Sequence, residues 1–266
     1  MSHISYSELK EWVTCPWKHK LNYIDKINEF KGNEYTAFGT ALHTVCENLV
    51  QSRSENATPV FDPKVLFQEE FLRNLKTLKD ETPDLVLRPE IVSDMRTQGE
   101  KLTEYIMPAL AQYFGKFEIF GVEEKLYEEM PKQDYNFKGF IDLVVKTNDG
   151  KYHIIDWKTC SWGWDNRKKS EKMVTYQLTL YKHFWCEKHN IDSKNVETHF
   201  ALLKRTAKKN LVEIFKVSSG DRKIQNALKL LNKALYNIKK SHHIKNRLSC
   251  YGRYGMCEYY KTEHCP

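Results

Sequence analysis

The chain of 266 residues is 41% hydrophobic, enough for one sizeable core or two small ones, and it contains no apolar stretch of the length of a membrane span. Its seven cysteines, an odd number without secretory context, argue against a disulfide-stabilised extracellular protein, and the polar segment 1–11 lacks the apolar region of a signal peptide, so we expect a cytoplasmic location. The formal net charge of +7 fits a nucleic-acid partner, although a basic soluble protein of any other kind would fit it equally well.

The first half of the chain is predicted to be largely helical, over 5–13, 36–53, 64–79 and 89–115. The first helix begins with a capping-box spacing of Ser5 and Glu8, and the second carries His43 and Glu47 one turn apart beside an apolar stripe. A lone helical histidine is more often a packed or solvated residue than a ligand, so His43 becomes a candidate only in the company of other ligands. The last two helices fall in a helical insertion of about 54–115, which we expect to form a cap or side wall.

A β-hairpin is predicted over 137–159, at the centre of the chain. Two apolar, β-branched runs flank Asn148-Asp149-Gly150, a turn sequence whose residues tolerate positive φ angles. Counting back from this turn pairs Asp142 with Asp156 across the two strands. The hairpin therefore predicts two carboxylates directly opposite one another.

These opposed carboxylates predict a cation site. They repel each other on a sheet, and neither lies where the apolar alternation favours an acid, so a bound divalent cation would turn a liability into a site. Lys158 projects on the same face as Asp156, where its ammonium can hold an attacking water or a phosphate oxygen, as phosphodiester hydrolysis requires. A strand predicted over 117–130 carries Glu123 and Glu124; one of them could support the metal, although solvated charge at a strand edge is the simpler interpretation.

The loop 160–172 after the hairpin combines aromatic and basic side chains. This combination suits stacking on bases and holding phosphates, and the residues concerned are Trp162, Trp164, Arg167, Lys168, Lys169 and Lys172. A mobile, solvated loop is an equally good interpretation. The remaining predicted elements are a helix over 171–188, strands over 196–204 and 211–217, a helix over 220–240 and an irregular, Cys-rich tail over 246–266.

Four motifs resemble, in order, those of the PD-(D/E)XK nuclease superfamily, and most closely its RecB-like branch, which includes the AddB nuclease domain and small CRISPR-adaptation exonucleases. They are Phe38-Gly39-Thr40-Ala41-Leu42-His43, Gly139-Phe140-Ile141-Asp142, Asp156-Trp157-Lys158 and Gln177-Leu178-Thr179-Leu180-Tyr181, with the early Cys15-Pro16-Trp17 as a further match. Any one of these motifs occurs by chance in many chains. Four in the family's order, on the expected element types, are specific.

The resemblance implies an α/β fold, in which helices flank a central mixed sheet of about four or five strands, with an N-terminal helical region and a Cys-rich C-terminal tail, in a single nuclease domain over 1–266. It implies that one Mg²⁺ or Mn²⁺ ion is bound by His43, Asp142, Asp156 and the backbone carbonyl of Trp157. Lys158 would then orient the attacking water or stabilise charge, while Gln177 and Tyr181 would orient the nucleic-acid strand or the lysine.

The resemblance also bears on the cysteines near the two chain ends. Many RecB-like nucleases join their ends through a [4Fe–4S] cluster with one N-terminal and three C-terminal cysteines, and Cys15, Cys250, Cys257 and Cys265 follow that order. The gaps of six and seven residues between the last three are wider than the usual pattern. Buried free thiols, a zinc site that uses His264 and a vestigial cluster therefore stay open as alternatives.

The predicted activity is metal-dependent hydrolysis of DNA, by an exonuclease acting on DNA ends or single strands in recombination, repair or processing. A helicase or recombination protein would be a suitable partner besides DNA. Two alternatives belong to other classes of protein. One is an inactive nuclease-fold module that only binds DNA or serves as a scaffold, although both carboxylates and the lysine are present. The other is a zinc-stabilised nucleic-acid-binding protein in which the acidic hairpin is incidental.

Overall fold

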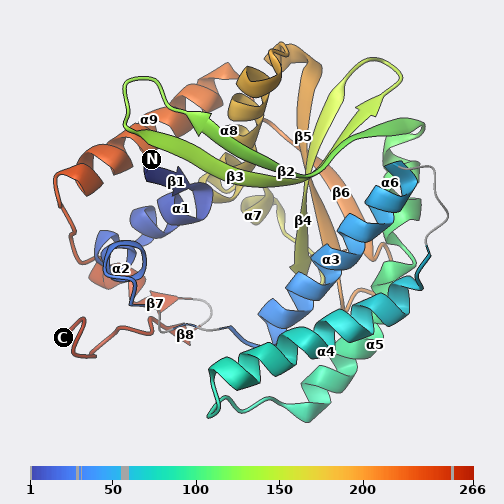
Figure 1. Ribbon diagram of the computed structural model, residues 1–266, viewed down its shortest axis with the longest axis horizontal. Coiled ribbons are helices and arrows are strands. Elements are labelled where there is room, and N and C mark those ends of the chain that lie inside the picture. Colours follow the sequence, from blue (N-terminus) through green and yellow to red (C-terminus); the bar gives the residue numbers. More distant parts are fainter. Residues whose placement is uncertain (1, 28–29, 31, 55–59, 253–254) are drawn as a thin grey trace. The chain divides into compact units, whose positions relative to one another are not determined.

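The computed structural model describes residues 2–27, 30, 32–54, 60–252 and 255–266. They form the expected α/β architecture, a mixed sheet flanked by helices (Figure 1). The predicted insertion and tail each include residues outside this description, 55–59 and 253–254. None of the described helices combines the length and the apolar content that crossing a membrane requires.

The chain divides into two compact units. The first, here called the sheet unit, contains Gly32–Leu126 and Phe140–Ser219. The second, the terminal unit, contains Met1–Lys31, Tyr127–Gly139 and Gly220–Pro266. Each unit is built from segments that are far apart in the sequence, so each depends on long-range contacts.

The strands of the sheet are β1 (Ser2–Ser5), β2 (Phe117–Glu129), β3 (Tyr135–Thr147), β4 (Tyr152–Cys160), β5 (Val196–Lys204) and β6 (Val212–Val217). Their order is β1-β3-β4-β5-β6, and β2 also pairs with β3. β4 is antiparallel to β3 and parallel to β5, which makes the sheet mixed. The sheet has six strands rather than the four or five expected, because β1 has only four residues, too few for a recognisable apolar alternation.

The predicted hairpin is confirmed. The N–H of Thr147 donates to the carbonyl of Lys151 over 3.0 Å and closes the turn. Gly150 adopts a φ of +82°, the region that a residue without a Cβ enters at least cost. The pairs of the ladder run from Lys146 with Tyr152 to Leu143 with Ile155. One further step along this register places Asp142 opposite Asp156.

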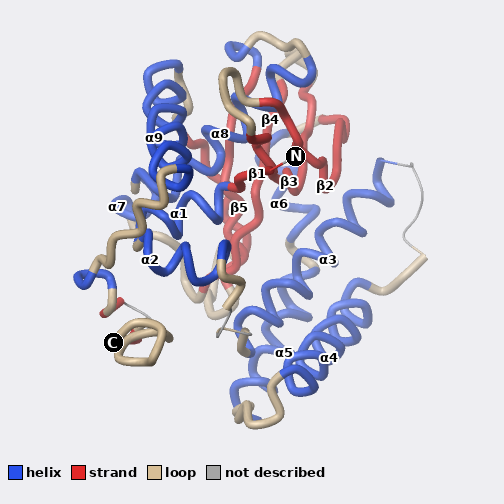
Figure 2. Tube along the Cα trace, turned by 60° about the vertical axis from the view of Figure 1, so that its left-hand side comes forward, coloured by secondary structure: helices blue, strands red, loops and turns tan. Residues whose placement is uncertain are grey.

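The helices of the sheet unit are α3 (Glu34–Ser54), α4 (Pro63–Glu81), α5 (Pro89–Thr103), α6 (Ile106–Phe114), α7 (Asn166–Ser170) and α8 (Lys172–His189), with a short 3₁₀ turn at Ser193–Asn195. The first three pack on one another (Figure 2). Together with α6 they share a core with Ile155 and Trp157 of β4. Helix α8 contacts β4 and β5. Two predicted elements therefore differ in detail: residues 160–172 contain the short helix α7, and 89–115 is two helices rather than one.

The break between α5 and α6 has a simple cause, Pro108. Within a continuous helix its ring would collide with the carbonyl of Glu104, and it has no N–H to donate. In the structure α5 ends at Thr103 and α6 begins at Ile106, so the proline lies in the first turn of α6, where the missing N–H costs nothing. The apolar periodicity of 89–115 continues through the break, and it therefore concealed the break.

The terminal unit contains β1, α1 (Tyr6–Thr14), α2 (Pro16–His19), a π-helical turn (Lys20–Ile24), α9 (Asp221–Lys239), a 3₁₀ turn (Arg247–Ser249), β7 (Tyr251–Gly252) and β8 (Gly255–Met256). Ser5 caps α1 by accepting from the N–H of Glu8 over 3.1 Å, as its spacing predicts. The N–H of Trp17 donates to the carbonyl of Ile244 over 3.2 Å, so the two ends of the chain meet within this unit.

Candidate active site

Two buried carboxylates lie at the centre of the candidate site, in the sheet unit. Asp156 on β4 is only 2% exposed, and the side chain of Asp142 on β3 is 12% exposed. Oδ2 of Asp142 accepts from the backbone N–H of Trp157 over 2.7 Å, and Oδ1 of Asp156 accepts from Nε2 of Gln177 over 2.7 Å. Each carboxylate is thus held by one hydrogen bond, which fixes its orientation.

Lys158 accompanies this pair, as strand alternation requires. Its Nζ lies 2.5 Å from Oδ2 of Asp156, and the side chain remains 32% exposed. The same Oδ2 is fully buried and, within the described part of the chain, has no aligned hydrogen-bond donor. A buried carboxylate oxygen in that position is a ready ligand for a cation, because leaving it unsatisfied is costly.

Helix α3 delivers His43 to the carboxylates. A Cβ on Gly39 would lie 3.2 Å from Oγ1 of Thr159, so the glycine lets α3 approach β4 closely. His43 Nδ1 lies 3.7 Å from Oδ2 of Asp142, and the ring is 34% exposed. Burial lowers the pKa of His43, and the charge of Lys158 lowers it further. The charge of Asp156 and a hydrogen bond with the backbone of Trp157 oppose this effect. The neutral imidazole is the form that binds metals.

Helix α8 supplies Gln177 and Tyr181, one turn apart on one face. Nε2 of Gln177 contacts both Oδ1 of Asp156 and, at 3.3 Å, the hydroxyl of Tyr181. Tyr181 is 7% exposed. Burial and the charge of Asp156 raise the pKa of its phenol, which therefore stays protonated at neutral pH. The two side chains form a polar support behind Asp156.

The electrostatics of the pair follow from its burial. Burial raises the pKa of Asp142 well above its ordinary value, the charge of Asp156 raises it further, and Lys158 opposes both effects. Asp142 therefore keeps its proton to a higher pH than a solvated carboxyl group does, and a divalent ion at this position would compete with that proton.

Glu123 is the acid that the sequence patterns did not select. It lies on β2 at a φ of +47°, in a region that non-glycine residues seldom enter. Burial, then the charges of Glu47 and Asp156, raise its pKa, which places its carboxylate near the pair. Its neighbour Glu124 points elsewhere and bonds Trp185 over 2.8 Å. Consecutive strand residues face opposite sides, so one of the two glutamates had to face the site, but the sequence does not tell which.

The loop after β4 is less available for nucleic acid than expected. Trp162 is 75% exposed, whereas Trp164 packs edge-on against Phe200, with ring centroids 5.2 Å apart. The two rings differ in exposure because Gly163, with a φ of +120°, turns the chain between them. Trp164 is thus half-buried and engaged by packing, so it is less open to a base than Trp162 is.

Neighbouring side chains also contact the lysines of this loop. Lys169 pairs with Glu213, and Nζ of Lys168 lies 4.5 Å from the centroid of the Trp164 ring. Nζ of Lys172 lies 5.4 Å from the centroid of Tyr176. Arg167 lies with Lys168 and Lys169 in the last turn of the short helix α7. The loop is therefore ordered by cation–ring contacts and one ion pair, not a wholly solvated segment.

The residues present fit a divalent cation. They supply carboxylate oxygens, one imidazole nitrogen and a backbone carbonyl, a ligand set suited to Mg²⁺ or Mn²⁺. The ligand atoms of His43, Asp142 and Asp156 do not all lie within 4.8 Å of one another, so the arrangement is more open than a closed ligand set.

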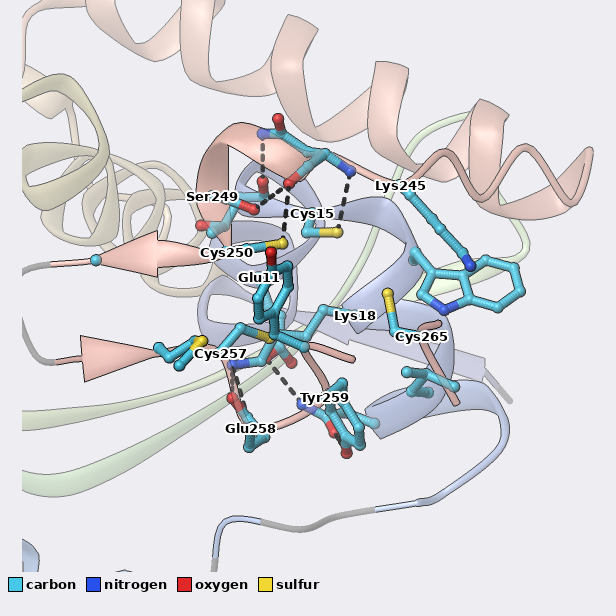
Figure 3. Close-up of a pocket in the computed structure, with 18 of the residues that line it drawn as sticks. Glu11, Cys15, Lys18, Lys245, Ser249, Cys250, Cys257, Glu258, Tyr259 and Cys265 are labelled. Carbon is cyan, nitrogen blue, oxygen red and sulfur yellow. Dashed lines mark hydrogen bonds and ion pairs between the residues drawn. The ribbon is translucent and has the colours of Figure 1, made fainter. Parts of the chain in front are cut away.

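The four cysteines singled out in the sequence line one pocket of about 860 Å³ in the terminal unit (Figure 3). The N–H of Asn246 donates to Sγ of Cys15 over 3.4 Å. No three of the described cysteine sulfurs lie within 4.8 Å of one another. A zinc ion with Zn–S bonds of about 2.3 Å holds its sulfurs roughly 3.8 Å apart. The pocket is thus wider than a preformed zinc site.

Protein contacts also hold the tail in this unit. The indole N–H of Trp17 donates to the carbonyl of His264 over 3.0 Å, and Lys18 pairs with Glu258 over 2.8 Å. Tyr259 is 1% exposed and packs with Leu21. These protein contacts attach the C-terminal tail to the N-terminal helices.

Comparison with known proteins agrees with this geometry. The family model of the PD-(D/E)XK nuclease superfamily matches residues 3–265. The crystal structure of a provisionally assigned exonuclease from Eubacterium rectale superposes with a TM-score of 0.52 at 13% identity, covering 98% of this chain and 86% of that one. Gene 69 protein of Mycobacterium phage L5 is 32% identical over 81 residues, which is 30% of this chain and 28% of the phage protein. The chain thus spans little of the length of that relative, and the structural likeness supports the fold alone.

Replacing Asp142 by Asn should stabilise the metal-free protein at neutral pH, by about 1–3 kcal/mol, the usual scale for one buried group. The folded state holds a proton that the unfolded chain releases near pH 4, so wild-type stability should fall as pH rises from there through the raised pKa of Asp142. Denaturant unfolding in EDTA at several pH values measures both effects.

Asp149→Asn is the matched control, because hydrogen bonds from Thr147 and from the backbone of Lys151 lower the pKa of Asp149. Its carboxylate contributes stability above its unfolded pKa and loses it as pH falls, so the substitution should not stabilise the protein. An Asp142→Asn protein less stable than wild type at every pH would contradict the repulsion described here.

Proposed function

Because the chain belongs to the PD-(D/E)XK nuclease superfamily, we propose that it is a metal-dependent deoxyribonuclease of the RecB-like branch, an exonuclease that acts on DNA ends or single strands. The observation that carries this proposal is the buried pair of Asp142 and Asp156 with Lys158 at 2.5 Å. An inactive module would have no reason to retain two repelling carboxylates and the lysine together. The histidine on α3 and the Gln177–Tyr181 pair on α8 support the branch.

His43, Asp142, Asp156 and the backbone carbonyl of Trp157 are the residues that would hold the Mg²⁺ or Mn²⁺ ion. When bound, such an ion supplies charge stabilisation to a scissile phosphate and makes a neighbouring water more acidic. Oxygen ligands favour Mg²⁺, whereas the imidazole makes Mn²⁺ at least as suitable. The charge of Asp156 raises the pKa of Glu123, so Glu123 belongs to the same acidic cluster.

The protein side chains carry the remaining roles. Lys158 has an exposed fraction of 32%, so its ammonium can leave Asp156 and hold the attacking water or a phosphate oxygen. Gln177 keeps Asp156 in one rotamer through its amide. Tyr181 holds Gln177 in turn, and it stays neutral because burial raises the pKa of its phenol. These two are positioning residues for the carboxylate.

Unpaired DNA is the substrate best suited to the surface of the loop. Trp162 presents a largely open ring, 75% exposed, on which an unpaired base can stack. Arg167 and Lys172 lie on the same loop, and the formal net charge of +7 favours a polyanion. Trp164 packs on Phe200 and Lys169 pairs with Glu213, and these contacts order the loop that carries Trp162.

The pocket of Cys15, Cys250, Cys257 and Cys265 is proposed to bind one [4Fe–4S] cluster. Its width favours a cluster over a single zinc ion, since each thiolate of a cluster binds a different iron. The N–H of Asn246 directed at Cys15 is the kind of hydrogen bond that supports a ligating thiolate. The group would be structural, because every residue that lines the pocket belongs to the terminal unit, whereas the carboxylates belong to the sheet unit.

Lys158→Ala should lower metal-dependent cleavage of end-labelled single-stranded DNA by about 10²–10³-fold, the usual cost of removing one preorganised charge donor. Lys146→Ala on the neighbouring strand β3 removes a lysine outside the site and should cleave normally. Covalently closed circular single strands should survive in every case. Cutting of the circle would refute the exonuclease assignment, and full activity of Lys158→Ala would refute the catalytic one.

The two tryptophans of the loop should separate in a binding assay. Trp162→Ala should weaken binding to single-stranded DNA by about 1–3 kcal/mol per lost stack, with little effect on duplex DNA. Trp164→Ala should instead lower the free energy of unfolding by about 2–3 kcal/mol, because it opens a cavity beside Phe200. Fluorescence anisotropy and denaturant unfolding measure the two effects. Equal losses on single-stranded and duplex DNA would argue against base stacking on Trp162.

Protein purified without oxygen should be brown and contain iron and sulfide, and Cys250→Ser should lose the colour together with thermal stability. Cys160→Ser, which changes a cysteine outside the pocket, should keep both properties. A colourless preparation in which the wild type holds one zinc ion more per chain than Cys250→Ser would decide for the zinc alternative. A stable, metal-free preparation would show that the contacts of Trp17, Lys18 and Tyr259 hold the tail alone.

A further inference from the structure

A second group of metal-ligand side chains lies in the sheet unit, apart from the carboxylate pair. Among the residues that the structure describes, His153, Glu197 and His199 bring three ligand atoms within 4.8 Å of one another. His153 lies on β4, three residues before Asp156, and therefore on the opposite face of the strand. His153 pairs with Glu197 in the parallel ladder to β5, and His199 lies two residues further along β5 on the same face.

The distances within this group are those of a metal site. Nδ1 of His153 lies 3.0 Å from Nε2 of His199 and 3.9 Å from Oε2 of Glu197. A tetrahedral zinc ion with bonds of about 2.0–2.1 Å separates its ligand atoms by about 3.4 Å. These two separations bracket this value, and the third, between the ligand atoms of Glu197 and His199, is at most 4.8 Å.

The outer nitrogens of both rings are already held by hydroxyl groups. Nε2 of His153 contacts Oγ1 of Thr147 at 2.9 Å, and Nδ1 of His199 contacts the hydroxyl of Tyr113 at 3.4 Å. The hydroxyl of Thr147 also donates to Oδ1 of Asp149 over 2.5 Å, so its oxygen accepts from Nε2–H of His153. The Nδ1 atom of that ring then has no proton, and its lone pair is available to a metal. Such outer partners fix the orientation and tautomer of ligating histidines.

Glu197 presents one oxygen to the histidines and the other to lysines. Its Oε1 contacts Nζ of Lys216 at 2.7 Å and Nζ of Lys151 at 3.3 Å, which leaves Oε2 facing His153. Both lysines are largely exposed, at 56% and 44% of their side chains, so solvent screens their repulsion of a cation. They would weaken binding, but they also hold the carboxylate in the orientation that binding needs.

Helix α6 closes the group against the core. The ring of Phe114 lies 5.0 Å from His153 and 5.2 Å from His199, centroid to centroid. His199 is 2% exposed and His153 is 7% exposed. The hydrogen bond between the two imidazoles involves only the two ring nitrogens, whereas a metal ion would be bound by both nitrogens and by the carboxylate.

We propose that His153, Glu197 and His199 bind one divalent transition-metal ion of the Zn²⁺ class. Two imidazole nitrogens and one carboxylate oxygen suit Zn²⁺ better than Mg²⁺. The ion ties β4 to β5 and, through Thr147 and Tyr113, to the end of β3 and to α6. Its role is structural, and the proposal does not depend on the nuclease assignment.

Equilibrium dialysis of the metal-stripped full chain against Zn²⁺ tests the proposal by counting bound ions. Glu197→Gln and His153→Gln should each bind one zinc fewer per chain than the wild type. The matched controls are Glu187→Gln and His183→Gln, which remove the members of a separate His–Glu pair, 3.4 Å apart on α8, and should bind as the wild type does. The count subtracts any zinc held by the carboxylate pair or by the cysteines.

A second measurement uses the wild type and one variant. Zn²⁺ should shift the ¹⁵N resonances of the ring nitrogens of His153 and His199 in the wild type and raise its melting temperature by about 5 °C at saturation. Glu197→Gln keeps a side chain of the same size at a position 19% exposed, so it should fold and lose this rise. Equal zinc counts in all five proteins, or unmoved histidine resonances at saturating Zn²⁺, would overturn the proposal whether or not the protein cleaves DNA.

Discussion

The repulsion between Asp142 and Asp156 is the constraint to which the surrounding structure responds. Two carboxylates are held opposite one another in a place almost closed to water, where each raises the cost of ionising the other. One backbone N–H, the amide of Gln177 and the ammonium of Lys158 each reduce that cost in part. The arrangement remains incompletely neutralised by these groups, and this residual repulsion suits it to binding a cation.

The rigid core around the carboxylates keeps them from relaxing. Ile155 and Trp157 flank Asp156 in the sequence and are buried in the core shared with α3 to α6. Turning Asp156 outwards would therefore expose two large apolar side chains, at a cost of about 1.5–3 kcal/mol for each. Glycine at position 39 lets α3 approach near Thr159, and His43 follows one turn later. Packing thus fixes groups that electrostatics alone would drive apart.

Strand β4 carries different chemistry on its two faces, and the terminal unit carries a third kind. The face with Asp156 and Lys158 offers oxygen ligands to a hard cation, whereas the face with His153 offers nitrogens to a borderline one. The thiols of the cysteine pocket suit softer iron or zinc. Ligand type therefore distinguishes the three sites, and variants of each ligand set allow them to be assayed separately.

Local sequence determined the hairpin, its register and the capping of α1. Asn148-Asp149-Gly150 fixes a turn whose register reaches Asp142 and Asp156 only six residues away, and Ser5 caps α1 through Glu8, three residues on. The resemblance to a nuclease family added His43 and Gln177, which the structure brings to the carboxylates.

Tertiary structure decided what depends on distant partners. His153 and His199 are 46 residues apart, and they meet only because β5 pairs in parallel with β4, a register that no local pattern encodes. Trp164 is only half-buried, and it packs on Phe200 and Phe215, which lie far from it in the sequence. Glu123 rather than Glu124 lies near the acidic pair, while Glu124 accepts a hydrogen bond from Trp185, a residue 61 positions away in the sequence. Short-range preferences act within a few residues, whereas burial and strand pairing are settled only when the whole sheet assembles.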